Sequence, residues 1–489
     1  MYFRSTIPKD VKVELPGRKD VYNLCKRSNY GGRVQPHKMS FTSSDDQIGK
    51  KHSEVNDYLL DLDVCSLYPT VMQKHLYPVG EGRFLKEAQI ATAQMAFNSR
   101  NLTHLKLGMY NVDVIPNPRL IVPVLPAKNA KGDTCWDLIP RTYQCYCLPD
   151  IVEGIKHGYT FKIIKAYVYD ASFPIFKKYV DKVFLIKQTE DYYKATKDPR
   201  YNPTRRMIAK LLMNSLYGKM SQKPIEDSNV SITSPAEFRK FLREYEWRDM
   251  HIMGDKAVAV GKKKNFQACV TRPMQLGSYI LAYSRSHMTG LMDLLDPVRL
   301  NITDNTSLLA SFENTFYYGD TDAMHVHSSH LHKLKDVMYE SSGTPPSLNG
   351  AEFDPKIHKG KQLGQLDDEL GGGKIIEAFY PAPKLYADRA LMPDNTIEEK
   401  IKGKGIVSYK LSWDDFPKLA RAEEVKKSFF FMTKYRLSVP QTMQDKGFDQ
   451  FSIEGRTRSR TLGKTQYSGR MKFDDGLTLP HGFDVSILK

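Results

Sequence analysis

Acidic side chains stand at two places where short apolar runs end. Asp63 closes the run that begins at Tyr58, and Asp320 and Asp322 lie one residue apart in a Gly-Asp-Thr-Asp sequence. Carboxylates crowded at one centre repel each other unless cations neutralise them, and hard oxygen ligands favour Mg²⁺ or Mn²⁺ over zinc. Two Mg²⁺ ions, for which Mn²⁺ can substitute, would suit an in-line displacement at phosphorus when they sit roughly 3.5–4 Å apart. Taken alone, the Asp pair is also typical of an ordinary turn.

A basic segment could serve this acidic centre. Arg206, Lys210, Asn214 and Tyr217 follow one another at spacings of four, four and three residues, so they share one face of a helix. Cations on such a face can bind triphosphate oxygens, and the tyrosine ring can pack on a nascent base pair. In isolation the same pattern describes a solvated cationic face with one buried tyrosine.

Strands and a helix pair must position these residues. Apolar patterns predict a strand over 58–65, the start of a helix over 70–75, a long helix over 271–295 and a strand over 375–380. A strand, tight turn and strand are expected over 315–326, with the acids at the turn. Two antiparallel helices are expected over 175–218, and Gly218 is placed as the C-cap of the second. Residues 107–165 predict a β-rich block, and residues 219–265 predict strands and loops.

The overall charge favours a polyanionic partner. Lys and Arg number 72 against 56 Asp and Glu, a net charge of +16, which attracts nucleic acid. The six cysteines contain no CxxC pair, so we expect reduced thiols rather than a zinc site. No signal-peptide core and no apolar run near the ~20 residues that cross a bilayer occur. We therefore expect no membrane partner and a cytoplasmic protein, in the host cytoplasm if a phage encodes it.

Three motifs resemble those of the family B DNA polymerases and occur in that family's order. Asp63-Val-Cys-Ser-Leu-Tyr-Pro69 resembles motif A (DxxSLYP), Lys210-Leu-Leu-Met-Asn-Ser-Leu-Tyr-Gly218 resembles motif B (KxxxNSxYG), and Tyr318-Gly-Asp-Thr-Asp322 resembles motif C (YxDTDS). Lys384-Leu-Tyr386 is similar to the KxY motif, and Tyr30-Gly-Gly-Arg33 is similar to the YxGG/A element. Lys187 and the long block between motifs A and B resemble the protein-primed branch, found in bacteriophages and linear plasmids.

The resemblance implies a role for each matching residue. The catalytic acids would be Asp63, Asp320 and Asp322, and the metal ligands would be Asp63, the Val64 carbonyl and Asp322. The residues that would bind the dNTP are Ser66, Leu67, Tyr68, Lys187, Arg206, Lys210, Asn214 and Tyr217, with Tyr68 excluding a 2′-hydroxyl. The residues that would contact DNA or the primer are Tyr30, Gly31, Gly32, Ser215, Gly218, Tyr318, Gly319, Thr321, Lys384 and Tyr386.

The expected fold is α+β, a right-hand polymerase with a palm sheet, two-helix fingers, a small basic thumb and insertions of the protein-primed type. The ranges are 1–75 (N-terminal segment and first part of the palm), 76–173 (first insertion), 174–220 (fingers), 221–265 (second insertion), 266–405 (second part of the palm) and 406–489 (thumb). The expected activity is a DNA-directed DNA polymerase that adds dNTPs to a primer 3′-hydroxyl on a DNA template. A terminal priming protein and a separate exonuclease polypeptide are the further partners implied.

The sequence departs from the family B pattern at two points, and three alternative functions are weighed. Ala323 replaces the serine of motif C, which would weaken primer contacts rather than abolish chemistry. Only about thirty residues precede Tyr30, so we expect no 3′–5′ exonuclease in this chain. A reverse transcriptase or RNA polymerase is disfavoured by Asp-Thr-Asp and by the motif B asparagine and tyrosine. A primer-independent family B enzyme and a non-catalytic nucleic-acid-binding scaffold derived from a polymerase stay open.

Overall fold

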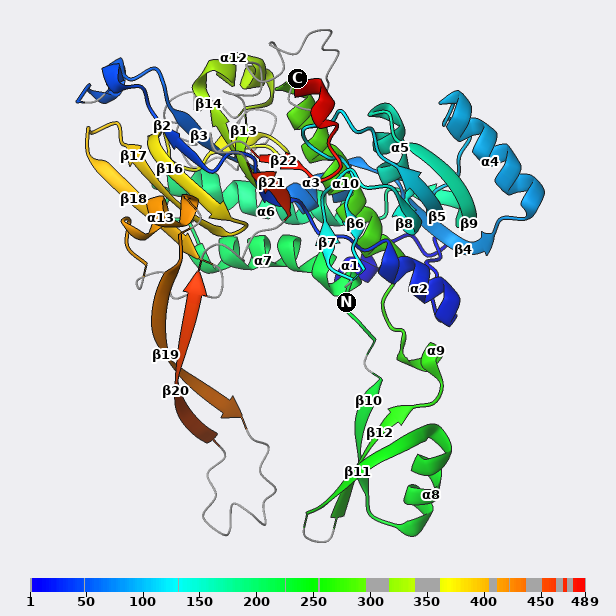
Figure 1. Cartoon of the computed structure of the whole chain (residues 1–489). Helices are drawn as coiled ribbons and strands as arrows, with labels where there is room; N and C mark the ends of the chain where they lie inside the picture. The colour runs from blue at the N-terminus through cyan, green and yellow to red at the C-terminus, as the bar shows by residue number, and fades with distance from the viewer. Residues whose placement is uncertain are drawn as a thin grey trace.

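A nine-stranded sheet lies on the left side of the body in the computed structural model (Figure 1). The structure describes residues 2–47, 49–130, 132–224, 226–253, 256–295, 316–338, 361–403, 411–421, 423–436, 451–462, 469–472 and 478–488. The strand order is β1-β13-β14-β3-β16-β17-β18, with β15 paired to β3 and β2 paired to β16. These strands are β1 (Val34–Pro36), β2 (Ser40–Thr42), β3 (Leu59–Val64), β13 (Phe316–Asp320), β14 (Ala323–His327), β15 (Leu366–Asp368), β16 (Lys374–Ala382), β17 (Leu385–Leu391) and β18 (Ile397–Gly403).

Strand β3 lies inside this sheet because its sequence is apolar on both faces. Leu59, Leu60, Leu62 and Val64 are buried, as a strand covered on both sides requires. The predicted strands over 58–65, 315–326 and 375–380 are thereby confirmed. Since β13 and β14 form a tight hairpin beside β3, the chain segments that carry motifs A and C are direct neighbours.

Four helices pack against one another next to the sheet. They are α3 (Leu67–Lys74), α6 (Lys177–Ala195), α7 (Pro203–Met220) and α10 (Met274–Leu294), and α6 and α7 form the expected helical hairpin. The α7 helix begins where Pro203 fixes the first turn and the Asn202 side chain accepts a hydrogen bond from the Arg205 amide. The prediction that Gly218 caps this helix is wrong, because α7 continues to Met220 and its C-cap is Ser221.

Residues 76–173 form a second sheet with strand order β4-β9-β5-β8. The strands are β4 (Tyr77–Phe84), β5 (Gly108–Ile115), β8 (Arg141–Cys147) and β9 (Thr160–Phe173), beside the short β6 (Ala127–Lys128) and β7 (Thr134–Cys135). The expected β-rich block is confirmed, but two helices were missed, α4 (Glu87–Ser99) and α5 (Leu148–Lys156).

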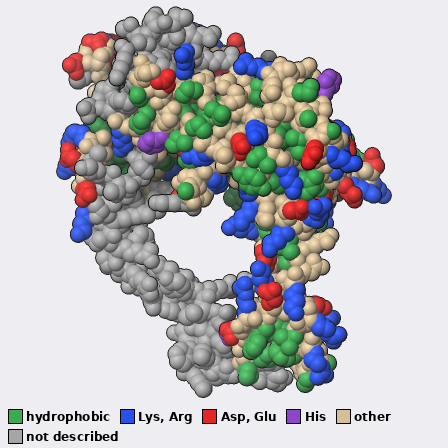
Figure 2. All heavy atoms as spheres, turned by 45° about the vertical axis from the view of Figure 1, so that its right-hand side comes forward, with side chains coloured by type: hydrophobic (Ala, Val, Ile, Leu, Met, Phe, Trp, Pro, Cys, Tyr) green, Lys and Arg blue, Asp and Glu red, His purple; other side chains and the backbone are tan. Residues whose placement is uncertain are grey.

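Residues 226–263 form a small module at the lower end of the molecule (Figure 1). Its sheet has the order β10-β12-β11, from β10 (Asp227–Ile232), β11 (Tyr245–Met253) and β12 (Lys256–Lys263), and α8 (Pro235–Glu244) packs on it. Strands were expected here and α8 was not, although Ser234 accepts a hydrogen bond from the Glu237 amide as an N-cap does. Hydrophobic side chains gather on this module in Figure 2, and the module exposes Leu242, Trp247 and Ile252.

The C-terminal residues do not form one unit. Helix α13 (Asp415–Ala420) packs on β16, and an antiparallel ribbon of β19 (Val425–Arg436) and β20 (Phe451–Leu462) projects from the same side of the body as the small module (Figure 1). Beyond the ribbon, β21 (Arg470–Lys472) and β22 (Thr478–Pro480) return to the body, where the Thr478 amide donates to the His37 carbonyl. The thumb expected over 406–489 stays a prediction, and within that range β21 and β22 contact the body rather than the ribbon.

No helix within the described residues is both long and apolar enough to cross a membrane. The N-terminal helices are α1 (Tyr2–Ser5) and α2 (Lys19–Arg27), and α9 (Phe266–Cys269) precedes α10. All six cysteines are free thiols, as expected.

Candidate active site

The acids of motifs A and C lie near one another in the central sheet: Asp63 is on β3, Asp320 ends β13, and Asp322 is in the turn between β13 and β14. Asp63 on β3 is opposite Ala323 on β14, and Ala323 is in turn opposite Asp320 on β13. The Val64 amide donates a 2.9 Å hydrogen bond to the Asp322 carbonyl, which fixes the turn against the end of β3. The structure therefore places the backbones of the three residues that were predicted as catalytic side by side.

Crowding and burial act on the charge of these acids. Burial, followed by Asp322 and Glu369, raises the pKa of Asp63 to about 8. Burial, followed by Asp320 and Glu369, also raises the pKa of Asp322, although its backbone hydrogen bond and Lys384 act in the opposite direction. A centre whose carboxylates resist ionisation in this way is one that a bound cation would stabilise.

Two further acids near this centre were missed. Asp367 on β15 lies directly opposite Asp63, and it forms an ion pair with Lys361. The Glu369 amide donates to the Asp61 carbonyl at 2.9 Å, which ties the end of this segment to β3. The run Leu-Asp-Asp-Glu at 366–369, directly before three glycines, was the available signal.

The donor set fits a hard divalent cation by its chemistry. Among the described residues, no group of three or more His, Cys, Asp or Glu side chains is gathered closely enough to hold a metal ion. The predicted ligand set of Asp63, Asp322 and the Val64 carbonyl contains only two such side chains, so it is compatible with that finding. Carboxylate and carbonyl oxygens are ligands that Mg²⁺ accepts, with water and substrate oxygens completing its shell.

The KxY segment lies against the other side of the acidic turn. Lys384 occupies the β16–β17 turn with a φ of 59°, its amide donates to the Tyr318 hydroxyl at 2.8 Å, and its ammonium group pairs with Asp320. The Tyr386 ring lies 5.1 Å from the ring of Tyr318, which is buried, as is Gly319. Four residues predicted to contact the primer are therefore contiguous with Asp320.

The glycines of the YxGG/A element approach the same turn from β1. Val34 pairs with Asp320, and the Thr321 amide donates to the Arg33 carbonyl at 2.7 Å. Thr321 has a φ of 67°, and a Cβ added to Gly32 would lie 2.7 Å from the Thr321 methyl carbon. A Cβ at Gly31 would meet nothing within 4 Å. Gly32 is thus required by the close approach of two backbones.

Tyr30 has a different environment from the one predicted. Its side chain is 1% exposed and its ring stacks on Tyr146 with 5.6 Å between centroids, so the ring does not face solvent. The Arg285 guanidinium, which forms a buried pair with Asp150 at 2.9 Å, donates to the Tyr30 carbonyl. Tyr30 therefore anchors the glycines that follow it, and its contact with DNA stays a prediction.

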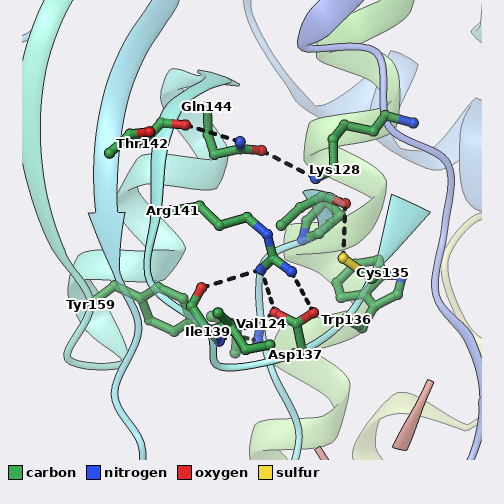
Figure 3. A network of polar contacts seen from close by, with 12 residues as sticks. Val124, Lys128, Cys135, Trp136, Asp137, Ile139, Arg141, Thr142, Gln144 and Tyr159 are labelled. Atoms are coloured by element: carbon green, nitrogen blue, oxygen red, sulfur yellow. Dashed lines mark hydrogen bonds and ion pairs between the residues drawn. The ribbon is translucent and has the colours of Figure 1, made fainter. Parts of the chain in front are cut away.

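A second anchor for this segment is the Arg33 side chain. Its guanidinium lies 4.5 Å from the Trp136 ring centroid and donates to the Pro123 carbonyl. Figure 3 shows how the Trp136 segment is held, because Arg141 grips the Asp137 carboxylate with two nitrogens, one of them at 2.8 Å. Residues 76–173 therefore hold the Arg33 side chain, and the Arg33 carbonyl in turn accepts the hydrogen bond from Thr321 in the acidic turn. The sequence did not indicate this support.

The predicted triphosphate cations lie on the helical hairpin. Lys187 on α6 and Arg206 on α7 both pair with Asp191, at 2.7 and 2.5 Å. Lys210 is exposed on the same helix as Arg206. The structure thus brings two of the three predicted cations together around the Asp191 carboxylate, which the sequence analysis did not predict as a site residue. Its i,i+4 spacing from Lys187 was the available signal. Other predicted residues of α7 are exposed, namely Asn214, Ser215 and Gly218.

The two tyrosines predicted at the nucleotide site are stacked on each other. Tyr68 on α3 and Tyr217 on α7 have ring centroids 3.9 Å apart and an interplanar angle of 25°. Ser66 adopts a left-handed φ of 54° just before α3, and Leu67 is buried beneath it. Tyr68 is partly buried against the core that contains Val71 and Met72, and it meets the helical hairpin through Tyr217.

Sequence comparisons place this arrangement in a family. Residues 2–294 match the family described as DNA polymerase type B, organellar and viral. The chain is 28% identical over 405 residues to a probable DNA polymerase of Neurospora intermedia, which covers 80% of this chain and 35% of that protein. It is 25% identical over 387 residues to a DNA polymerase of Kluyveromyces lactis, covering 76% of this chain and 32% of that protein. The chain spans about a third of the length of these curated relatives.

A solved structure shares the fold. The Phi29 DNA polymerase, in a ternary complex with primer-template DNA and incoming nucleotide substrates, superposes with a TM-score of 0.50 at 17% identity. The alignment covers 94% of this chain and 65% of that chain, so the expected α+β polymerase fold is confirmed. Since the family match extends over more than half of the residues, the chain belongs to the organellar and viral family of type B DNA polymerases.

Proposed function

We propose that this chain is a DNA-directed DNA polymerase that adds dNTPs to a primer 3′-hydroxyl with the help of two divalent metal ions. The single observation that carries the proposal is the acidic centre, where Asp63 on β3 lies opposite Ala323, the residue that follows Asp322, and the pKa of both acids is raised. A structural turn has no need for carboxylates that burial and mutual repulsion make costly to ionise.

The surrounding residues support this chemistry. Asp63 and Asp322, with the Val64 carbonyl, would hold the metal ions, which would activate the 3′-hydroxyl and stabilise the leaving pyrophosphate. Lys384 and Tyr386 would position the primer strand beside the metal ligands, since Lys384 already pairs with Asp320.

The nucleotide would enter from the side of the helical hairpin. Lys187, Arg206 and Lys210 would bind the triphosphate, and phosphate oxygens would take the place of Asp191 on the first two. Tyr68 and Tyr217 would form the floor under the sugar and the nascent base pair.

A primer-extension assay tests the proposal. The purified chain is incubated with primed DNA, dNTPs and Mg²⁺ beside Asp322→Ala and beside Asp20→Ala, which changes an exposed acid far from the centre. We expect extension by the native chain and by Asp20→Ala, and none by Asp322→Ala. Binding of primed DNA without extension in Mg²⁺ or Mn²⁺ would instead favour the non-catalytic scaffold.

Protein priming is the finer part of the proposal. The relatives in fungi and the family description support a polymerase of the organellar and viral type, and a terminal protein hydroxyl would serve as its first primer. The absence of a 3′–5′ exonuclease stays a prediction, which degradation of a 3′-labelled primer without dNTPs would contradict.

A further inference from the structure

Asp61, two residues before the predicted metal ligand Asp63, belongs to a group of polar side chains inside the sheet. Asp61 is 3% exposed, and its carboxylate pairs with Lys400 on β18 at 2.5 Å and with His325 on β14 at 3.4 Å. Asp61 and Asp63 are on one face of β3 because side chains alternate along a strand. The ion pair therefore ties the catalytic strand to the outermost strand of the sheet.

The contacts continue from His325 to the KxY segment. The Tyr380 hydroxyl lies 2.7 Å from His325 Nδ1, and the Tyr380 ring stacks on Tyr318 with centroids 5.2 Å apart and an angle of 8°. The Tyr318 hydroxyl accepts the hydrogen bond from the Lys384 amide at 2.8 Å. We call this connected set the Asp61 relay; its members are Lys400, Asp61, His325, Tyr380 and Tyr318.

Stability alone is a poor reason for such a group. Burying an ion pair costs desolvation, and apolar side chains of similar size often serve a core equally well or better. Asp388, opposite Lys400 on β17, adds a second carboxylate that is 1% exposed and accepts no hydrogen bond within the described residues. Buried carboxylates thus lie on β3 and on β17, and β17 begins directly after Lys384.

The relay also reaches Tyr386. Its ring lies 5.5 Å from the His325 ring and 5.1 Å from the Tyr318 ring, so a shift of His325 would move it. The Lys384 backbone and the Tyr386 ring therefore both contact residues of the relay.

We propose that the Asp61 relay is a positioning device for the primer end, acting through Lys384 and Tyr386. None of its buried members needs to touch DNA, because each acts on the next. The inference rests on the proposed function, since it names what holds the primer side of that site.

The chain offers a matched control in Asp293. Its carboxylate also bridges a lysine and a histidine, Lys156 at 2.8 Å and His157 at 2.9 Å, but it joins the ends of α10 and α5. Asp61→Asn and Asp293→Asn therefore remove equivalent ion pairs at two places. Tyr380→Phe removes one relay hydroxyl without emptying the core.

The experiment measures binding of a fluorescent primer-template by anisotropy, extension by one nucleotide, and thermal unfolding for each variant. We expect Asp61→Asn to raise Kd and KM for primer-template about tenfold, the scale of a lost charge-assisted hydrogen bond, with KM for dNTP within about twofold of native. Tyr380→Phe should also raise Kd and KM for primer-template. Lys400→Arg should keep the native values of both constants, whereas Lys400→Met should raise them. Asp293→Asn should lower Tm without changing the DNA constants.

Two results would overturn the relay. One is that Asp61→Asn and Tyr380→Phe lower Tm but bind and extend primer-template as Asp293→Asn does. The other is that KM for dNTP rises as much as KM for DNA. If the native chain bound primed DNA without extending it, the proposed function would fail. The Kd values from anisotropy would still show whether the relay variants bind primer-template more weakly than Asp293→Asn does.

Discussion

Replacing Gly32 by alanine should damage the active site through one steric contact. The added Cβ would lie 2.7 Å from Thr321 Cγ2 and 3.1 Å from Thr321 Cα and Cβ. The first distance is about 0.8 Å inside the ~3.5 Å at which two carbon atoms attract most. Thr321 cannot yield freely, because its amide is bonded to the Arg33 carbonyl and its φ is 67°.

The size of the effect follows from that overlap. Overpacking of this kind typically costs about 1–3 kcal/mol of stability. If the strain moves the turn by most of an ångström, Asp320 and Asp322 are misplaced, and misplacement by ~1 Å can cost about 100-fold in rate. We expect kcat for single-nucleotide extension to fall about 10- to 100-fold, whereas Gly31→Ala, whose Cβ meets nothing within 4 Å, should fall far less.

A second-site change makes the assay decisive. Thr321→Ser removes the methyl group that clashes, so the double variant with Gly32→Ala should recover part of the lost kcat. Thermal unfolding of each variant shows whether the fold is intact. Native kcat for folded Gly32→Ala, or no recovery in the double variant, would refute the close-approach explanation.

Three other perturbations give distinct expectations. Asp191→Asn should lower KM for dNTP about two- to fivefold in steady-state extension, since each partly exposed ion pair that the triphosphate displaces is worth ~0.2–1 kcal/mol; a raised KM would contradict this. The pKa of Asp63 is raised to about 8, so below that pH Mg²⁺ must displace a proton in order to bind. The Mg²⁺ affinity measured by calorimetry should therefore fall as the pH drops below about 8 and level off above it. An affinity that does not change with pH would show that the carboxylate is already ionised. Asp150→Ala leaves Arg285 buried without its carboxylate and should cost about 3–5 kcal/mol in denaturant unfolding, whereas Asp20→Ala, an exposed pair, should cost under about 1 kcal/mol.

Local patterns were enough to predict the elements that carry the acids. The apolar run before Asp63 and the Gly-Asp-Thr-Asp turn define strand ends by themselves, and both strands were confirmed next to each other. Helix α10 was also anticipated within three residues at its start and one at its end. Helix α8 was missed because its apolar positions are few and cover only a small core formed with the β10–β12 sheet.

Long-range contacts explain what the sequence could not predict. Tyr30 was assigned to DNA because its motif suggested it, but its burial depends on Tyr146, Asp150 and Arg285, which are distant along the chain. The Asp61 relay likewise joins residues up to 339 positions apart, as the Asp61–Lys400 bond shows. Spacing along one element cannot reveal such partners, because only the folded sheet brings them together.

We propose that Asp63 and Asp322 hold the metal ions that drive nucleotide addition. The direct measurement is single-turnover incorporation of one dNTP into a pre-bound primer-template over a range of Mg²⁺ concentrations, for the native chain and for Asp63→Asn. We predict a rate that rises cooperatively with Mg²⁺ in the native chain and falls at least about 1000-fold in the variant, because the metal-held transition-state charge is lost. A folded Asp63→Asn chain that binds DNA and incorporates at the native rate would contradict the account.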